Sequence, residues 1–200
     1  MIALFGPAGS GKSLQGQLLA EKYGWEWLSV GELLRSQKDV KIDKQLESGE
    51  LVDDELVVKL MHDVMVRMNK SETEVILDGY PRNSDQAKWM AENGDMDMVK
   101  GAIVLEVDRE ELWKRIEERD RNDDTREAVE RRWEIFEQNI CSILPLLEAG
   151  NVKITTLDGV GKIDEVTARI EAVLREWGAL DELAILASEE KDGEEKSYGE

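Results

Sequence analysis

The chain has 200 residues and carries 45 acidic against 26 basic side chains, which gives a formal net charge of -19. This length predicts one domain, and a 41 % share of hydrophobic residues is enough for a sizeable core. Non-specific binding to nucleic acid or to an anionic membrane needs a basic surface, so we expect neither as a partner.

The single cysteine, Cys141, excludes an internal disulfide. Together with the single histidine, His62, it cannot supply the roughly four ligands of a zinc site. No apolar run reaches the about 18 residues of a membrane span, and the start MIALFG lacks the basic region of a signal peptide. We therefore expect a cytoplasmic protein, with Cys141 in the core and His62 as a packing or surface residue.

Apolar runs and helical patterns alternate along the chain. We expect parallel strands at Ile2–Phe5, Trp25–Leu28, Val75–Leu77, Ala102–Val107 and Val152–Thr156. We expect helices at Ser13–Tyr23, Gly31–Arg35, Asp54–Met68, Asp85–Glu92, Glu110–Arg119, Thr125–Leu147 and Ile163–Trp177. Pro145 is expected to bend or split the long helix that contains it. The alternation predicts an α/β fold, with a parallel sheet covered by helices on both faces.

Three segments depart from simple alternation. Residues 29–70 carry several helical patterns between two strands, which predicts a small inserted subdomain. Residues 116–126 form a highly charged junction between two helices. The last 20 residues hold 8 acids and 2 bases, so we expect residues 181–200 to be an acidic, disordered tail.

Residues 6–13 read GPAGSGKS and fit the phosphate-loop pattern G-x-x-x-x-G-K-[ST] in full, between a predicted strand and a predicted helix. Glycines let successive backbone N–H groups curl around a phosphate. A lysine brings positive charge to the β- and γ-phosphates, and the hydroxyl after it can ligate Mg²⁺. The pattern predicts nucleoside triphosphate binding through Gly6, Gly9, Ser10, Gly11, Lys12 and Ser13.

Charged side chains follow the predicted strands. Asp78 ends one strand, where a carboxylate can hold the water shell of Mg²⁺ together with Ser13, and Arg82 just beyond can bind a second phosphate group. Further arginines gather beside loops near strand ends, at Arg35, Arg115, Arg119, Arg121, Arg131 and Arg132. Guanidinium forks match the oxygens of a transferring phosphoryl group, so this set favours phosphoryl transfer.

Five segments occur in an order that is recognisable: FGPAGSGKSLQ, LSVGELLR, LESGELVDDELV, ILDGYPRNSDQA and RNDDTREAVERR. Over about residues 1–177 the chain resembles the adenylate kinase family of nucleoside monophosphate kinases. The resemblance implies a P-loop NTPase-type three-layer fold with a five-stranded parallel sheet, as a kinase domain over residues 1–180. It implies a monophosphate-binding insert at 29–58 and a short lid at 116–126. The implied reaction is Mg²⁺-dependent, reversible phosphoryl transfer from ATP to a nucleoside monophosphate.

The resemblance also implies roles for single residues. Lys12 and the loop backbone hold the phosphates of ATP, and Arg115 lies against its adenine. Asp123 and Asp124 match an acid pair at the lid hinge. The residues implied at the transferring phosphoryl group are Lys12, Arg82, Arg119, Arg121 and Arg132. The residues implied at the acceptor are Ser29, Val30, Arg35, Val52, Gly79, Arg82 and Gln86.

Some positions depart from the family pattern. Leu14 follows Ser13 where the family usually has threonine, and Glu32 replaces an aspartate. Val30 lacks the hydroxyl that adenylate kinases place near the acceptor base, whereas the carboxamide of Gln86 can pair with an adenine edge. We favour AMP as the acceptor. The alternatives are UMP or CMP, another small-molecule P-loop kinase, or a non-catalytic nucleotide-binding protein, and we expect a monomer.

Overall fold

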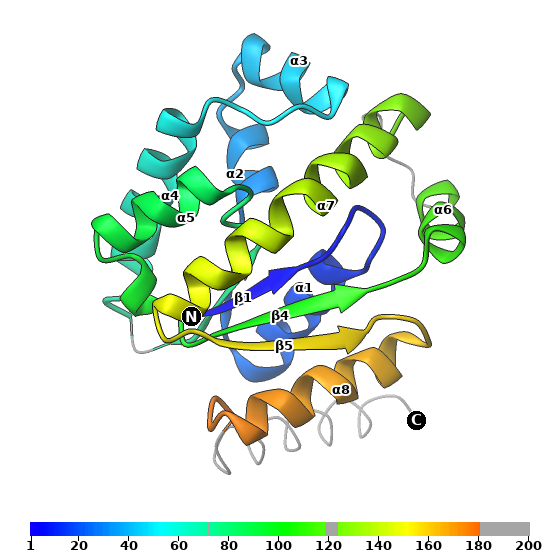
Figure 1. Cartoon of the computed structure of the whole chain (residues 1–200). Coiled ribbons are helices and arrows are strands. Elements are labelled where there is room, and N and C mark those ends of the chain that lie inside the picture. The colour runs from blue at the N-terminus through cyan, green and yellow to red at the C-terminus, as the bar shows by residue number, and fades with distance from the viewer. Residues whose placement is uncertain (72, 119–123, 181–200) are drawn as a thin grey trace, which may run out of the picture.

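The computed structural model describes residues 1–71, 73–118 and 124–180. Its centre is a five-stranded parallel sheet in the order β2-β3-β1-β4-β5 (Figure 1). The strands are β1 (Ile2–Phe5), β2 (Glu26–Ser29), β3 (Val75–Asp78), β4 (Gly101–Glu106) and β5 (Lys153–Asp158). Each lies within two residues of its predicted position, so the predicted parallel α/β fold is confirmed.

Helices connect the strands. They are α1 (Lys12–Tyr23), α2 (Val30–Ser36), α3 (Val40–Ser48), α4 (Asp54–Met68), α5 (Ser84–Glu92), α6 (Arg109–Glu117), α7 (Arg126–Ala149) and α8 (Ile163–Glu176), with a 3-10 turn η1 at Met96–Met98. None of the helices in the described ranges is long and apolar enough to cross a membrane. The tail at 181–200, and residues 119–123 of the expected lid, lie outside the described residues.

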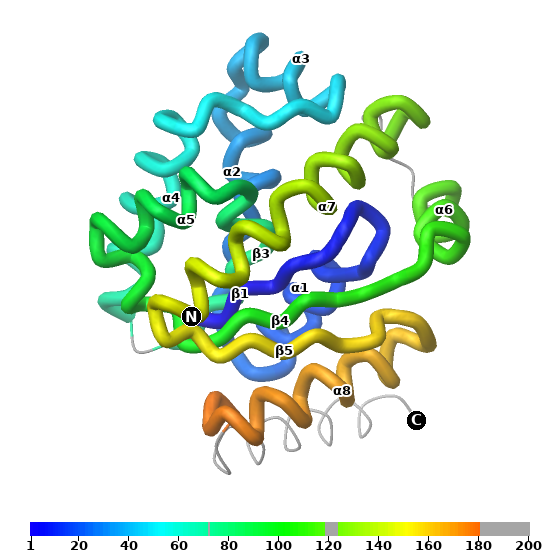
Figure 2. The backbone as a smooth tube through the Cα atoms, in the orientation of Figure 1, coloured from blue at the N-terminus to red at the C-terminus, as the bar shows by residue number. Residues whose placement is uncertain are grey.

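The two faces of the sheet pack against different helices because strand side chains alternate between the faces. Ala3 and Phe5 of β1 belong to a core built with α4, α5 and α7. Ile2 and Leu4 belong to a second core built with α1 and α8. Figure 2 shows the resulting layers, with α7 along one face of the sheet and α8 along the other.

One expectation about α7 is wrong, and of the two outcomes expected at Pro145 one does not occur. The helix is not split there, because α7 continues to Ala149. Cys141 is exposed instead of packed in the core. The buried stripe of α7 runs through Val129, Trp133, Ile143 and Leu147. Cys141 lies two positions from Ile143, about 200° around the helix, so it points away from the sheet.

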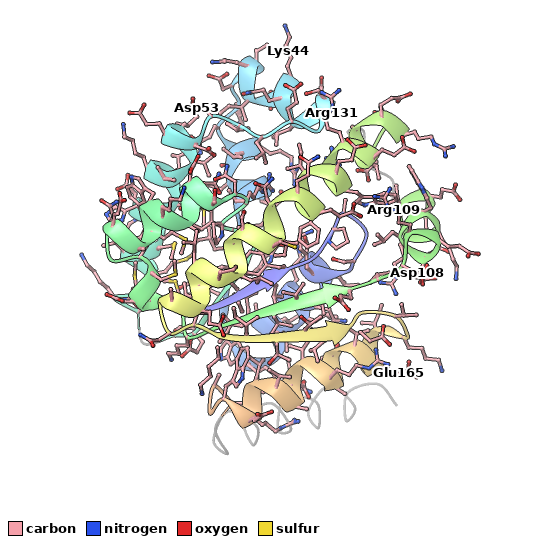
Figure 3. The ribbon with its side chains drawn as sticks, viewed as in Figure 1. Lys44, Asp53, Asp108, Arg109, Arg131 and Glu165 are labelled. Carbon is pink, nitrogen blue, oxygen red and sulfur yellow. The ribbon has the colours of Figure 1, made fainter. Side chains whose placement is uncertain are left out.

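Three helices, α2, α3 and α4, connect β2 to β3, in the region where an insert is predicted. Ser29 caps α2 and Asp53 caps α4, each accepting a hydrogen bond from a backbone N–H three residues later. The segment after α3 reaches across to α7, where Arg131 Nη1 lies 2.7 Å from Glu50 Oε1. Figure 3 labels Arg131 at its place on α7. Of these three helices, α3 therefore lies against α7.

Candidate functional site

A pocket opens where β1, β2 and β3 end, the edge at which parallel α/β sheets bind ligands. One part of its lining is polar, carries four basic side chains, and comprises Gly6, Lys12, Ser13, Ser29, Arg35, Asp78, Gly79, Arg82 and Arg132. Another part is apolar and comes from the end of α3, the segment after it, and α7: Leu46, Leu51, Ile135, Phe136, Ile140 and Ile143. Such a pocket suits ligands that combine a phosphate with a flat, less polar group.

The phosphate loop needs its glycines for close approach. Gly9 has a φ of +89°, and a Cβ there would lie 3.0 Å from the carbonyl oxygen of Leu112. A Cβ on Gly6 would lie 2.4 Å from Ser10 Oγ. The loop ends at Gly11, which caps α1 without a side-chain hydrogen bond. The first N–H groups of α1 therefore carry no side-chain cap, as in helix starts that bind phosphate.

Two buried oxygens near the loop have no hydrogen-bond partner among the described residues. They are Ser10 Oγ and Asp78 Oδ1, on side chains that are 1 % and 3 % exposed. Asp78 ends β3 in register with Leu4 of β1 and Ser29 of β2, which places its carboxylate at the edge that bears the phosphate loop. An unpaired buried carboxylate oxygen is costly, so it indicates a group reserved for a ligand or its water shell.

Guanidinium groups converge at the basic part of the pocket. The Nη2 atoms of Arg35 and Arg82 lie 3.2 and 3.6 Å from the position that a Cβ on Gly31 would occupy. Burial lowers the pKa of Arg82 to about 10; the charge of Asp78 opposes this shift, and those of Arg35 and Arg132 add to it. Arg82 thus stays charged at neutral pH among other cations, an arrangement that an anion stabilises.

Arg132 and Arg115 are held in place from different sides. Arg132 Nη1 pairs with Asp124 at 2.8 Å and its Nη2 donates to the carbonyl of Leu46 at 3.1 Å. Arg115 bonds through Nε to Glu111 at 2.8 Å, and its two other nitrogens donate to the carbonyls of Ser10 and Gly159. The sequence analysis did not predict that Gly159 contacts Arg115. A local indication of a turn at this position is the glycine pair in the segment DGVG at the end of β5.

Comparisons with known proteins agree with this geometry. A family model described as adenylate kinase matches residues 4–151. An adenylate kinase of Mycobacterium ulcerans is 36 % identical over 181 residues, covering 84 % of this chain and 95 % of the relative. One of Mycobacterium leprae is 39 % identical with the same coverage, and one of Maricaulis maris is 33 % identical over 88 % of this chain and 98 % of its own length.

The chain belongs to the adenylate kinase family. It is a nucleoside monophosphate kinase, and the resemblance found in its sequence is confirmed. Within this adenylate kinase homologue, the structure brings together at one pocket the predicted residues Gly6, Lys12, Ser13, Ser29, Arg35, Asp78, Gly79, Arg82 and Arg132. Arg115 lies beside the phosphate loop, where its Nη1 donates to the carbonyl of Ser10. Arg119, Arg121 and Asp123 lie outside the described residues.

Three predicted acceptor residues do not line the pocket. Val30 and Val52 are 1 % and 4 % exposed and belong to the core that α4 and α7 share. Gln86 is 1 % exposed and is held by hydrogen bonds to Asp54 and to the backbone of Arg82. Their roles at the acceptor base stay predictions. The apolar wall of α7, which includes Phe136, was not among the predicted site residues, although its helical spacing indicates a buried face.

Trp89 at the end of α5 does not line the pocket either. Its ring packs edge-on against His62, with ring centroids 5.4 Å apart. His62 Nδ1 in turn lies 2.7 Å from Oδ1 of the buried Asp95. This cluster joins α4 to the segment after α5, in agreement with a packing role for His62.

Proposed function

We propose that this kinase transfers the γ-phosphoryl group of ATP to AMP, reversibly and with Mg²⁺, giving two molecules of ADP. The observation that carries the proposal is the convergence of Lys12, Arg35, Arg82 and Arg132 on one pocket beside the phosphate loop. Several cations in one pocket are needed when two phosphorylated anions must be brought together against their mutual repulsion. The names of the relatives support AMP as the acceptor.

In this mechanism the phosphate loop and Lys12 bind the β- and γ-phosphates of ATP. Arg35 and Arg82 bind the phosphate of AMP, which is already ionised and needs no general base. One of its oxygens attacks the γ-phosphorus in line, and the bond from that phosphorus to the oxygen bridging to the β-phosphate breaks, so that ADP leaves. Arg132 is placed to stabilise charge on the equatorial oxygens, which is the main catalytic requirement of such a step.

The residues present fit a magnesium ion that is bound mainly by nucleotide phosphates and water. Ser13 can supply a hydroxyl, and Asp78 Oδ1 is a buried carboxylate oxygen without a hydrogen-bond partner among the described residues. No group of three or more histidine, cysteine or acidic side chains that could hold a metal gathers in residues 1–71, 73–118 and 124–180. Mg²⁺ commonly keeps several waters and takes few protein ligands; when bound, it neutralises phosphate charge.

Arg115 supports the placement of ATP. Its planar guanidinium is held by two backbone carbonyls and Glu111, so it presents a fixed cationic face next to the phosphate loop. Guanidinium groups stack on flat aromatic rings, and an adenine is such a ring. Leu14, which is 43 % exposed at the start of α1, adds exposed apolar surface close to the loop in the sequence.

The test is ADP formation from ATP and AMP in the presence of Mg²⁺. Arg82→Ala should lower the rate by about 10³-fold or more, because it removes a cation from the phosphate cluster. Arg67→Ala is the matched control, since Arg67 is exposed in the last turn of α4 and donates to the backbone carbonyl of Asp63 within the same helix. Transfer to no nucleoside monophosphate by the unmodified protein would contradict the proposal.

A second candidate acceptor is a pyrimidine monophosphate, UMP or CMP. It is favoured by the valine at position 30, which offers no hydroxyl to an adenine edge. The values of kcat/KM for AMP, CMP, UMP and GMP with ATP distinguish the two candidates. Equal values for all four would mean that the base is not read at all.

The proposal includes a cytoplasmic location and a monomeric state. A single cysteine and the absence of a membrane-length apolar run in the sequence support the first. Sedimentation at several protein concentrations tests the monomer, which requires one constant mass near 22.7 kDa.

A further inference from the structure

A network of polar side chains joins the start of α4 to the start of α5. Both carboxylate oxygens of Asp54 accept from Asn83 Nδ2 at 3.0 Å, and Asp54 Oδ1 also accepts from Gln86 Nε2 at 2.7 Å. Gln86 Oε1 accepts from the backbone N–H of Arg82 at 2.7 Å. The chain of hydrogen bonds therefore leads from Asp54 to the backbone of a residue that lines the phosphate pocket.

Each amide in this network has only one consistent orientation. A carboxylate only accepts, so the side-chain nitrogens of Asn83 and Gln86 must both face Asp54. Their oxygens then face backbone donors, because Asn83 Oδ1 accepts from the N–H of Gln86 at 2.9 Å and so caps α5. Asp54 thereby determines how both amides hold residues 82–86.

The network connects two walls of the pocket. Pro81 and Arg82 line it from the segment before α5, and Leu51 lines it from the segment before α4. Asp54 is the first residue of α4, while Asn83 is the N-cap of α5. Because Gln86 is 1 % exposed, these bonds form where water competes little for the donors.

We propose that Asp54 is a positioning residue for the acceptor half of the reaction. It orients Asn83 and Gln86, and through them it holds the backbone from which Arg82 reaches the phosphate of the nucleoside monophosphate. Asp54 does not line the pocket, so it acts on the substrate only through these partners. The inference rests on the proposed function, since it assigns Arg82 to the acceptor phosphate.

The first test is Asp54→Asn. In this variant an N–H₂ group replaces one of the two carboxylate oxygens, and it cannot accept a hydrogen bond. It then faces the N–H₂ group of Asn83 or Gln86, so a hydrogen bond is lost and the network loosens. We expect the KM for AMP to rise about tenfold while the KM for ATP stays unchanged, because the phosphate loop has no part in the network. Glu55→Gln is the matched control: the next residue in α4 is also acidic, but it is exposed and pairs with Lys59.

The second test is rescue by exchange. In Asp54→Asn/Asn83→Asp the carboxylate and the amide change places, so the introduced amide can donate to the introduced carboxylate and still accept from Gln86. An aspartate at position 83 also remains a good helix cap. We expect Asn83→Asp alone to raise the KM for AMP, because two carboxylates then face each other, and the double variant to recover most of the loss.

Equilibrium binding of AMP, measured by calorimetry, separates this inference from the proposed reaction. If the unmodified protein transfers phosphoryl groups but Asp54→Asn changes neither KM nor AMP affinity, the positioning role is wrong. Equal changes in the KM for ATP and AMP, or a double variant no better than the single ones, also overturn it. If the unmodified protein neither transfers to AMP nor binds it, the proposed function fails and the inference falls with it.

Discussion

The donor and acceptor halves of the pocket are built by different means. On the donor side, the phosphate loop packs against the core, and its backbone is tied directly to other elements: Trp133 Nε1 donates to the carbonyl of Ala8 at 2.8 Å. On the acceptor side, α2, α3 and the start of α4 also contribute to the core, for example through Val30, and polar side-chain contacts join them further to α5 and α7. Examples are Arg131 with Glu50 and Asp54 with Asn83.

Because of this difference, the two halves should respond differently to substitutions. The geometry of the donor half follows from glycine backbone and buried packing, so a substitution there removes a part of the chemistry outright. The acceptor half depends on several contacts of which many are exposed, and an exposed ion pair contributes only about 0–1 kcal/mol. Acceptor binding should therefore be adjustable in small steps, and the following substitutions test that contrast from the largest expected effect to the smallest.

Lys12→Ala tests the donor half. Lys12 begins α1 and lines the pocket, and its removal takes a full charge from the β- and γ-phosphates. We expect kcat to fall by about 10³-fold or more, measured as ADP formed at saturating ATP and AMP, while the affinity for AMP alone stays the same. A fall of less than about tenfold would contradict the idea that the donor half carries the chemistry.

Gly49→Ala tests the docking of the acceptor half on α7. Gly49 ends α3 with a φ of +76°, and a Cβ there would lie 2.4 Å from the backbone oxygen of Ala128, which no side-chain rotation can relieve. We expect α3 to be displaced from α7, a rise of about tenfold in the KM for AMP and a loss of about 1–2 kcal/mol in stability. The KM for ATP should not change.

Gly24→Ala is the matched control for this substitution. Gly24 also has a positive φ, of +67°, at the end of a helix, but a Cβ there would meet nothing within 4 Å. It should show a similar loss of stability from backbone strain with no change in either KM. Equal effects of the two substitutions on the KM for AMP would mean that contact with α7 does not position the acceptor half.

Glu171→Gln tests a contact far from the pocket, on the other face of the sheet. Glu171 of α8 is 6 % exposed and accepts from Lys22 Nζ at 2.9 Å and from Tyr23 at 2.8 Å, both at the end of α1. Burial alone would raise the pKa of Glu171, but the hydrogen bonds from Lys22 and Tyr23 outweigh it, so the pKa lies below its ordinary value.

A carboxyl group with a lowered pKa stabilises the fold above its unfolded value of about 4.5, and this contribution is lost as pH falls through the folded pKa. At pH 7, Glu171→Gln should therefore reduce the free energy of unfolding by about 1–3 kcal/mol, measured by urea denaturation. The difference from the unmodified protein should shrink as pH falls below 4.5 and through the lowered pKa of Glu171. Both KM values should stay unchanged, and a change in either would mean that the two faces are coupled.

The donor half could be predicted from sequence more completely than the acceptor half. The phosphate loop is a local sequence pattern, and the places where two strands end determine the positions of Lys12, Ser13 and Asp78. In the acceptor half, Arg82 likewise follows from the segment after β3. By contrast, the bonds of Asp54 to Asn83 and Gln86 join positions 29 and 32 residues apart, so neither spacing nor composition predicts them. Such pairings depend on how helices dock, which is decided by packing over the whole chain.

The errors in sequence reasoning have the same origin. The pattern of α7 predicts its length, but the rotation of the helix about its axis determines that Cys141 is exposed while Phe136 lines the pocket. The burial of Val30 likewise depends on α4 and α7 packing over α2. The position of a strand end or a glycine-rich turn does not depend on how the helices rotate and pack. Those features were therefore located correctly.

The smallest effect is expected from Glu50→Gln, which removes the ion pair with Arg131. Both side chains are about half exposed, at 53 % and 50 %, so the pair should contribute less than 1 kcal/mol. We expect the KM for AMP to rise about two- to threefold at low ionic strength and the effect to disappear at about 0.5 M salt, where charges are screened within a few ångströms. Lys88→Gln, which breaks the exposed pair with Asp85 on α5, should have no effect on KM under either condition. A rise that persists at high salt would mean that Glu50, which also lines the pocket, acts on the substrate directly and not through the contact between α3 and α7.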